Sequence, residues 1–485
     1  MHPNSANFIS SAEAFAKALP PGIVRNRDHA SPATTPPRAL RPLLPLLAAL
    51  TLAGCAVTPG SAPSSGTLPT TSIPTGSQTP HTGTTKPVAT DAAPTAKPGT
   101  AAGPAGADAQ AGFAEWRSAF AARALAAGIR PDTVHTALGK AKWQPRVVEL
   151  DRSQPEFTRA PWAYLDSAVS AQRIAQGRAQ LEQHRATLEA AAQRYGVPAT
   201  VITAIWGMES NYGTNFGSFR AVDALATLTH EGRRRAWAES ELLAALRILD
   251  QGDIAADRMV GSWAGAMGHT QFLPSVFLAH AVDADGDGHR DIWGSIPDVA
   301  ASTANFLARS GWQSTSTWGS EVVLPAAFDH GRADPAVRQS AAQWEAEGLR
   351  AADGQALPPL ADAYIITPAG ARGPAFLVGN NFRAILRYNN SVSYALAVGL
   401  LARQIDGGPA VAAPWPRDLA PLSRAQLQTM QEALNRKGFA AGTPDGVMGP
   451  ATRAGLRGFQ RSIGLPPDGY PTLELLQRLQ ATPAS

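Results

Sequence analysis

The sequence predicts a mainly α-helical protein with minor β structure, followed by a small three-helix domain at its C-terminal end. Three observations support this fold class. Apolar residues recur at helical spacing through much of residues 111–410, Pro residues cluster at 409–421, and residues 421–483 contain the same turn twice between helical segments. The 485 residues are enough for two or three domains.

Residues 1–55 have the features of an exported leader. Arg38 and Arg41 precede an apolar run over residues 43–50, and small residues lead from this run to Cys55. A basic region, a short apolar stretch and small residues are typical of a secretory signal peptide, and the run is too short for a membrane span. The Leu-Ala-Gly-Cys sequence ending at Cys55 resembles the lipobox of bacterial lipoproteins, which implies a lipidated Cys55. The alternative is a stray cysteine beside a chance apolar run.

Residues 56–110 consist almost entirely of Ser, Thr, Pro, Gly and Ala, so they have little to bury, and we expect a disordered linker. Cys55 is the only cysteine, which excludes an intramolecular disulfide. The net charge of +4 is mild and no basic stripe is present, so the sequence indicates no nucleic-acid partner.

Helical periodicity begins at Phe113, Trp116 and Phe120, and Gly128 is the expected stop. A second helix is predicted to carry Leu181 and Tyr195 and to end at Gly196, and further helices alternate with Gly-rich turns to about residue 310.

Residues 311–375 predict minor strands in short apolar runs at 322–324 and 365–366, and a last long helix is expected at 393–404. Beyond the Pro-rich joint, helices are expected around Leu427, Leu456 and Leu473. The turn Pro-Asp-Gly occurs at 444–446 and again at 467–469.

Glu209 is the strongest candidate for chemistry. Ile202, Ile205 and Glu209 are spaced i, i+3, i+7, so the carboxyl group shares the face that the isoleucines bury. It also falls in the last turn of its helix, where the helix dipole disfavours a negative charge. Both effects favour the protonated acid, as a general acid at neutral pH requires. The alternative is a structural Glu with a buried hydrogen bond.

Four separated segments, 149–157, 209–228, 261–274 and 381–395, resemble, in this order, those of the membrane-bound lytic murein transglycosylase B family. The resemblance covers about residues 111–410 and implies a lysozyme-like catalytic domain.

The resemblance also implies the reaction. Glu209 would protonate the glycosidic oxygen between N-acetylmuramic acid and N-acetylglucosamine in peptidoglycan. It would then accept the proton of the muramoyl O6 as a 1,6-anhydro ring closes, and no catalytic cofactor is required. The residues implied to contact or orient the sugar are Ser262, Gln271, Tyr388, Asn389 and Tyr164. Each of these could instead have a purely structural role.

Two other functions remain open. A hydrolytic muramidase would need a second carboxylate, such as Asp223, because ordinary glycosidases use a pair. A scaffold lipoprotein would bind the wall with an inactive domain, although the intact motif around Glu209 argues against this.

An acidic loop over residues 283–291 places oxygens at positions 1, 3, 5 and 9 of an EF-hand-like pattern, with Gly288 at the turn position. Position 12 is Gly294 rather than Glu. The family resemblance implies a structural calcium ion with a later final carboxylate, and its ligands would be Asp283, Asp285, Asp287, the carbonyl of His289, and Asp298. The alternative is an acidic turn without a metal.

Residues 421–483 resemble the peptidoglycan-binding domain type 1 family, through the Asp-Gly turn at 445–446, Thr452 and Phe459. A generic helical bundle or a dimerisation module is the alternative. Together these resemblances imply peptidoglycan glycan strands as partner, membrane attachment through a lipid anchor, and a position on the periplasmic face of the outer membrane.

Overall fold

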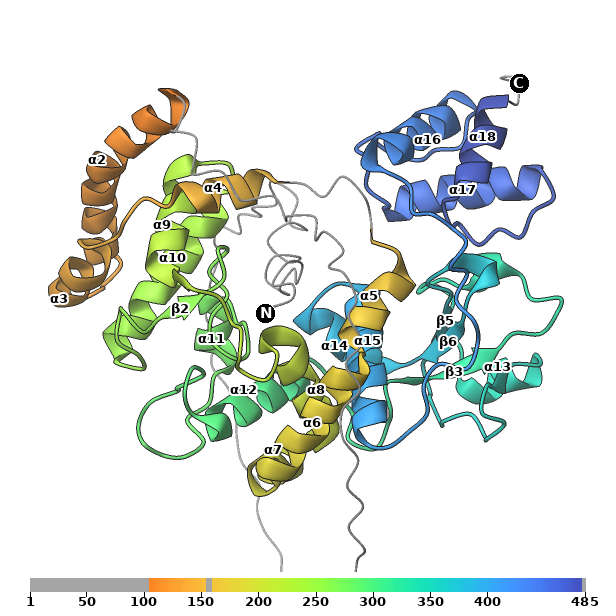
Figure 1. Cartoon of the computed structure of the whole chain (residues 1–485), viewed down its shortest axis with the longest axis horizontal. Helices are drawn as coiled ribbons and strands as arrows, with labels where there is room; N and C mark the ends of the chain where they lie inside the picture. The colour runs from red at the N-terminus through yellow and green to blue at the C-terminus, as the bar shows by residue number, and fades with distance from the viewer. Residues whose placement is uncertain (1–103, 154–158, 482–485) are drawn as a thin grey trace, which may run out of the picture. The chain divides into compact units, whose positions relative to one another are not determined.

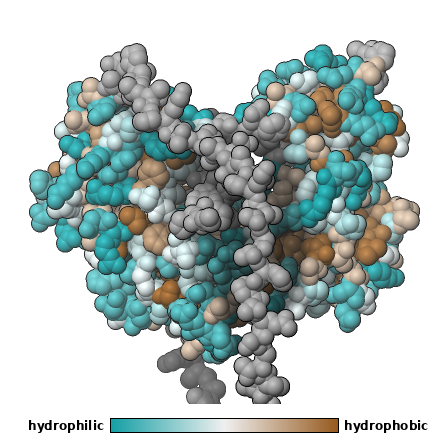
Figure 2. All heavy atoms as spheres, in the orientation of Figure 1, coloured by the Kyte–Doolittle hydropathy of each residue, from teal (hydrophilic) through white to brown (hydrophobic). Residues whose placement is uncertain are grey.

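The computed structural model describes residues 104–153 and 159–481. The leader, Cys55 and almost all of the Ser/Thr/Pro-rich segment lie outside these ranges, so their roles stay predictions. None of the helices within the ranges is long and apolar enough to cross a membrane. Hydrophilic side chains dominate the face visible in Figure 2, where hydrophobic ones form small scattered groups.

The described chain is mainly helical, as predicted (Figure 1). Residues 104–251 form α2 (Pro104–Ala126), α3 (Pro131–Thr133), a π-helix (Val134–Leu138), α4 (Pro145–Arg152), α5 (Pro161–Ala168), α6 (Ala171–Gln183), α7 (Arg185–Tyr195), α8 (Ala199–Ser210), α9 (Ala221–Glu231) and α10 (Arg235–Gln251). Later helices are α11 (Pro274–His280), α12 (Ile296–Arg309), α13 (Ala341–Ala346), α14 (Asn380–Tyr388), α15 (Val392–Ile405), α16 (Arg424–Arg436), α17 (Pro450–Ser462) and α18 (Leu473–Ala481). Short 3-10 turns occur at His330–Arg332 and Gly370–Arg372.

Helix α8 is enclosed by other helices. It packs against α6, α7, α12 and α15, which surround it in Figure 1. Every residue from Val201 to Ser210 is buried, whereas the spacing of the isoleucines predicted a single buried face. The polar end of this helix is therefore held rigidly by packing on all sides.

The prediction of a single helix through Leu181 and Tyr195 is wrong, because the helix is interrupted at His184 and forms α6 and α7. His184 leaves helical geometry, with ψ of 24°, and its ring lies 5.7 Å from that of Trp206 on α8. A tertiary contact thus accompanies a break that local periodicity did not reveal.

Two small antiparallel sheets complete the body. Strand β1 (Phe219–Arg220) pairs with β2 (Val260–Gly261), which joins the loop after α8 to the segment that follows residue 261. The other sheet has the order β4-β3-β6-β5, from β3 (Gly319–Val323), β4 (Arg350–Ala351), β5 (Tyr364–Ile366) and β6 (Ala375–Val378). The two predicted strands form β3 and β5, while β4 and β6 were not predicted.

The last three helices enclose a core of their own, formed around Met430, Leu434, Leu456 and Phe459. The Pro-rich joint, residues 409–421, is hydrogen-bonded to a strand of the preceding part of the chain. The backbone N–H groups of Ala412 and Ala413 both donate to the buried carboxylate of Glu321 on β3, each at 2.8 Å.

Candidate active site

Glu209 lies in the last turn of α8, and only 5% of the residue is exposed. The helix ends directly after it, since Asn211 and Tyr212 have φ values of 49° and 58°. Ser210 supports this reversal because its hydroxyl donates to the carbonyl of Trp206 at 3.2 Å and accepts from the N–H of Gly213 at 3.0 Å. The carboxyl group is thereby fixed at the point where the chain leaves the core.

A cleft of about 340 Å³ contains the Glu209 side chain. Its walls come from α6, the end of α8, the loop between α8 and β1, and the segment after β2. The lining residues are Leu150, Arg173, Met208, Glu209, Asn211, Asn215, Phe216, Gly217, Ser218, Phe219, Ser262, Trp263 and Gln271. Among the described residues that line this cleft, Glu209 is the only carboxylate.

Tyr394 on α15 contacts the carboxyl group directly. Its hydroxyl donates a hydrogen bond to Oε1 of Glu209 at 2.5 Å, and the residue is buried. Burial raises the pKa of Tyr394 well above its usual range, and the negative charge of Glu209 raises it further. Tyr394 therefore remains a protonated donor that stabilises the ionised form of Glu209.

Two more tyrosines lie in the electrostatic field of Glu209. Tyr388 at the end of α14 donates its hydroxyl hydrogen to the carbonyl of Thr270 at 2.7 Å, and Tyr164 is carried by α5. Burial, followed by the charge of Glu209, raises the pKa of both residues above the usual range. All three phenols therefore stay neutral at physiological pH, and among the described residues the hydroxyl of Tyr394 contacts the carboxyl group.

Ser262 and Gln271 line the same cleft as Glu209, as expected for residues that contact substrate. Ser262 also shapes its own turn, because its hydroxyl oxygen accepts from the N–H groups of Ala264 at 3.3 Å and Ala266 at 3.1 Å. The Nε2 of Gln271 donates to the carbonyls of Phe216 and Gly268, each at 3.0 Å. The amide of Gln271 is therefore held in place, and no described residue donates to its oxygen.

Tyr388, Asn389 and Tyr164 are not among the residues that line the cleft. Asn389 caps the end of α14 with 4% of the residue exposed, and no described residue donates to its buried Oδ1. The structure thus brings three of the six predicted site residues into one cleft. Two of the others, Tyr388 and Tyr164, are near enough for the charge of Glu209 to act on them.

Two residues of this site were missed at the level of sequence. Arg173 on α6 lines the cleft although it is 5% exposed, and its guanidinium contacts the carbonyl of Ala168 at 3.2 Å. Burial lowers the pKa of Arg173. Tyr394 lies 185 positions from Glu209 along the chain, so no local spacing relates the two. The only signal was its place in the fourth family-like segment.

Gly217 shows why the loop after α8 requires a glycine. Its φ is +95°, and a Cβ placed on it would lie 2.1 Å from the carbonyl oxygen of Gly261. No other residue fits without moving the backbone. This close approach holds the loop of the cleft against β2 and so sets the distance between the two walls.

Asp223, the second carboxylate that a hydrolase would need, does not line the cleft. It is 2% exposed and accepts hydrogen bonds from Lys142 N at 3.3 Å and Gln144 Nε2 at 3.4 Å. Burial raises the pKa of Asp223. These contacts tie the residue to the segment before α4 and give it a structural role.

The acidic loop gathers three carboxylates. Oxygens of Asp283, Asp285 and Asp287 lie within 4.8 Å of one another, and no ion pair among the described residues neutralises them. Hard oxygen donors at this spacing suit a calcium ion. Asp298 is fully buried, and burial raises its pKa to about 6, but it accepts from the N–H groups of Ala284 and Asp291, each at 2.7 Å. His289 donates its N–H to Asp287 at 2.8 Å.

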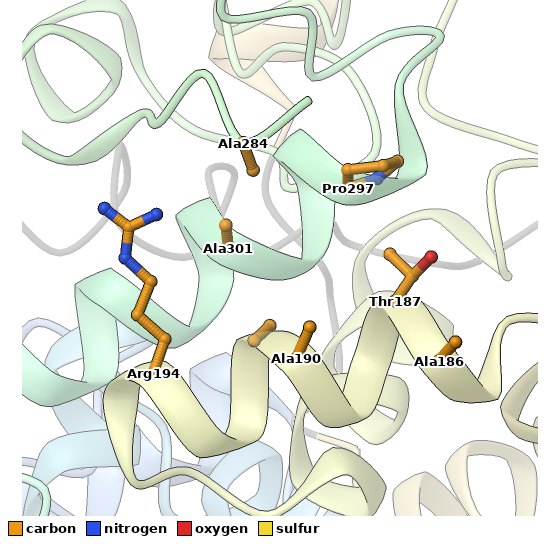
Figure 3. Close-up of a pocket in the computed structure, with 8 residues that line it drawn as sticks. Ala186, Thr187, Ala190, Arg194, Ala284, Pro297 and Ala301 are labelled. Atoms are coloured by element: carbon orange, nitrogen blue, oxygen red, sulfur yellow. The ribbon is translucent and has the colours of Figure 1, made fainter. Parts of the chain in front are cut away.

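A second cavity of about 360 Å³ lies between α7 and α12 beside the acidic loop (Figure 3). Most of its described lining residues are alanines, and Arg194 is the one charged side chain among them. This cavity therefore offers no carboxylate or histidine for acid–base chemistry among its described lining, in contrast to the cleft of Glu209.

Comparisons with known proteins identify the family of the chain and its domains. The family model of the Transglycosylase SLT domain matches residues 112–403, and that of a peptidoglycan binding domain matches residues 423–479. The crystal structure of SltB3 from Pseudomonas aeruginosa in complex with NAG-anhNAM-pentapeptide is 49% identical, with a TM-score of 0.74, and the match covers 76% of this chain and 99% of that one.

Two matches from Escherichia coli are more distant. The lytic transglycosylase Slt35 in complex with calcium is 29% identical, with a TM-score of 0.52, over 60% of this chain and 92% of that one. Membrane-bound lytic murein transglycosylase B of strain K12 is 34% identical over 228 residues, which are 46% of this chain. The match spans 61% of the length of that curated relative.

Proposed function

The chain belongs to the Transglycosylase SLT domain family, and from this premise we propose that it is a lytic transglycosylase of peptidoglycan. It would cleave the β-1,4 bond between N-acetylmuramic acid and N-acetylglucosamine and leave a 1,6-anhydromuramic acid end. The observation that carries this proposal is a single buried carboxylate, Glu209, in a cleft whose described lining holds no second one. The complex of SltB3 with a fragment that contains anhNAM supports the same reaction.

The proposed chemistry uses Glu209 twice. The protonated carboxyl group first gives its proton to the glycosidic oxygen, and the C1–O bond of the muramoyl unit breaks as the N-acetylglucosamine leaves as an alcohol. The O6 atom of the same muramoyl unit then attacks C1 and gives its proton to the Glu209 carboxylate. The acid is restored and no water enters the product, so a second carboxylate is unnecessary.

Tyr394 supports this cycle by stabilising the carboxylate state. The Tyr394 hydroxyl donates its hydrogen bond to Glu209, and burial keeps this hydroxyl protonated. The buried Arg173 adds a positive charge to the same cleft. Gln271 and Ser262 would hold the sugar from the opposite wall, while Tyr388, Asn389 and Tyr164 would orient groups at its margin.

The other assignments extend this function to the whole protein. Residues 421–483 would bind the wall, and Asp283, Asp285 and Asp287 would hold a structural calcium ion, with Asp298 and the His289 carbonyl as further ligands. Slt35 in complex with calcium supports the metal. Lipidation of Cys55 would attach the enzyme to the periplasmic face of the outer membrane. A fatty-acid probe should label wild-type cells but not Cys55→Ala, and equal labelling of both would exclude the anchor.

Mass analysis of the muropeptides released from purified peptidoglycan tests the reaction. Each product of a lytic transglycosylase ends in 1,6-anhydromuramic acid and is one water lighter than the corresponding hydrolytic product. Products with reducing muramic acid ends would identify a hydrolase and require a different catalytic pair.

A further inference from the structure

The two Pro-Asp-Gly turns of the C-terminal domain are built alike. We call residues 444–447 turn one and residues 467–470 turn two. Each follows a helix that carries a glutamine, α16 in the first case and α17 in the second, and each precedes the next helix. The two turns therefore occupy equivalent places in an internal repeat.

Three hydrogen bonds of turn one have a counterpart in turn two. In turn one, Gln431 Nε2 donates to Asp445 Oδ1 at 3.0 Å, and the N–H of Gly446 donates to the Gln431 Oε1 at 2.8 Å. In turn two, Gln460 Nε2 donates to Asp468 Oδ1 at 2.6 Å, and the glycine N–H again donates to the glutamine Oε1 at 2.8 Å. The Oδ1 atom of each aspartate also accepts the N–H two residues on, at 2.8 Å in both turns.

The backbone repeats as well. Gly446 and Gly469 have φ values of +70° and +69°. A Cβ on either would lie against the Cγ of an arginine, Arg424 at 2.5 Å and Arg453 at 2.6 Å. Because Oδ1 of each aspartate accepts the same hydrogen bonds within its turn, the Oδ2 atoms of Asp445 and Asp468 have equivalent orientations in the two turns.

Turn two shows what this arrangement binds. The Oδ2 atom of Asp468 accepts the N–H of Ala371 at 2.8 Å, in the loop between β5 and β6. The preceding Gly370 has a φ of +69°, and a Cβ on it would lie 2.5 Å from Asp468 Oδ2 and 2.7 Å from Tyr470. Tyr470 packs against a small hydrophobic cluster that includes Ala369. Turn two thus holds the amide N–H of an alanine, which is preceded by a residue in the left-handed conformation.

Turn one presents the same groups to solvent. Asp445 is exposed, and no described residue donates to its Oδ2 atom. Val447, which corresponds to Tyr470, is 52% exposed. The Oδ2 atom of Asp445 is therefore an oriented acceptor that no described donor uses, and the exposed Val447 side chain provides an apolar surface beside it.

We propose that turn one is a ligand site that accepts an amide N–H beside a methyl group, and that the peptide stem of peptidoglycan supplies it. The assignment rests on the proposed function, which gives this domain the wall as its partner. The alanine residues of the stem and the N-acetyl groups of the glycan carry such an amide. The left-handed Gly370 in turn two favours the stem, because a D-residue adopts positive φ without the strain that an L-residue meets.

Titration of the whole protein with a synthetic stem pentapeptide ending in D-Ala-D-Ala tests the site. Asp445→Asn keeps Oδ1 for the internal bonds but replaces the Oδ2 acceptor with a donor, so we expect binding at least about fivefold weaker, as for a charge-assisted hydrogen bond. Val447→Ser should also weaken it. Asp353→Asn, at an exposed aspartate that accepts from the N–H of Gln355, is the matched control and should bind as the wild type does.

Equal pentapeptide binding by wild type and Asp445→Asn, at unchanged melting temperature, overturns the site. Asp445-dependent binding of tri-N-acetylchitotriose in place of the pentapeptide overturns the stem as the source of the amide. Product analysis on the same samples separates this inference from the proposed function. If the products carry anhydro ends and Asp445→Asn binds the pentapeptide as the wild type does, the site alone is contradicted. If the products carry reducing ends, the enzyme assignment is contradicted, whatever turn one binds.

Discussion

The contact between Glu209 and Tyr394 joins two helices and fixes one oxygen of the proposed acid. A carboxyl group in a buried site is costly when ionised, and the phenol hydroxyl at 2.5 Å offsets part of that cost. The proposed cycle passes through the ionised state each time the proton is given to the leaving group. Stabilising that state without supplying a second acid is what a single-carboxylate mechanism needs.

Tyr394→Phe should therefore slow catalysis while it preserves the ring that packs in the core. The loss of a hydrogen bond to a charged group is about 1.5–3 kcal/mol, which corresponds to a fall in kcat of roughly ten- to hundredfold. KM should change little. The matched control is Tyr364→Phe, a buried tyrosine on β5 that does not line the cleft, and it should retain wild-type kinetics. A Tyr394→Phe enzyme with unchanged kcat would remove Tyr394 from the mechanism.

Single residues differ in how far sequence could assign them. Glu209 was identifiable because its helix is continuous, its spacing is regular and its surroundings match a family. Arg173 was not, since an arginine on a polar-looking helix reads as a surface residue until α8 and its neighbours enclose it. Asp223 could be proposed as a partner from sequence, and only the contacts with Lys142 and Gln144 reveal its structural use.

The elements of the body were predictable where local pattern determines them. The helix after Phe113, the helix near residues 393–404 and the three helices at the C-terminal end each have a clear apolar repeat, and all are present. The break at His184 and the strands β4 and β6 were not predicted, because each depends on a partner distant in sequence. Long-range pairing leaves little trace in a single short segment.

The acidic loop is the element on which metal binding can be tested by itself. Calcium should raise the melting temperature of the protein, because a ligand that binds only the folded state stabilises it by mass action. Asp287→Ala removes one of the three clustered carboxylates and should abolish this response. Asp353→Asn, outside the loop, should respond as the wild type does. A wild-type melting temperature that calcium does not change would favour the metal-free acidic turn.

At the scale of the whole molecule, the Pro-rich joint matters as much as the domains that it joins. Sequence composition predicted a separator, whereas Glu321 binds two of its backbone N–H groups and Arg417 forms an ion pair with Asp166 of α5 at 2.7 Å. The C-terminal domain adds an ion pair between the buried Arg457 and the partly exposed Asp334, also at 2.7 Å. The joint is thus partly a structural strap of the catalytic body.

Two truncations separate these roles. A chain that ends after residue 420 keeps the strap and should cleave soluble fragments at nearly the wild-type rate, although it binds insoluble peptidoglycan more weakly. A chain that ends after residue 408 leaves the Glu321 carboxylate buried without its two donors, which costs about 1–3 kcal/mol or more and should lower the melting temperature. If the chain that ends after residue 420 lost all activity on soluble fragments, the C-terminal domain would complete the active site.

The central claim is that one carboxylate performs both proton transfers, and Glu209→Gln tests it most directly. Glutamine keeps the shape and an oxygen that can accept from Tyr394, but it can neither give nor take the catalytic proton. The matched control is Glu241→Gln, another buried glutamate, which is bound by Ser275 and does not line the cleft.

The measurement is the rate at which each purified variant releases 1,6-anhydromuropeptides from peptidoglycan, with the melting temperature as a check on folding. General acid–base steps contribute about 10²–10⁴-fold each, and one residue serves both here, so Glu209→Gln should lose at least about 10³-fold. Glu241→Gln, if folded, should stay near the wild-type rate. Release by a folded Glu209→Gln protein at the wild-type rate would contradict the account.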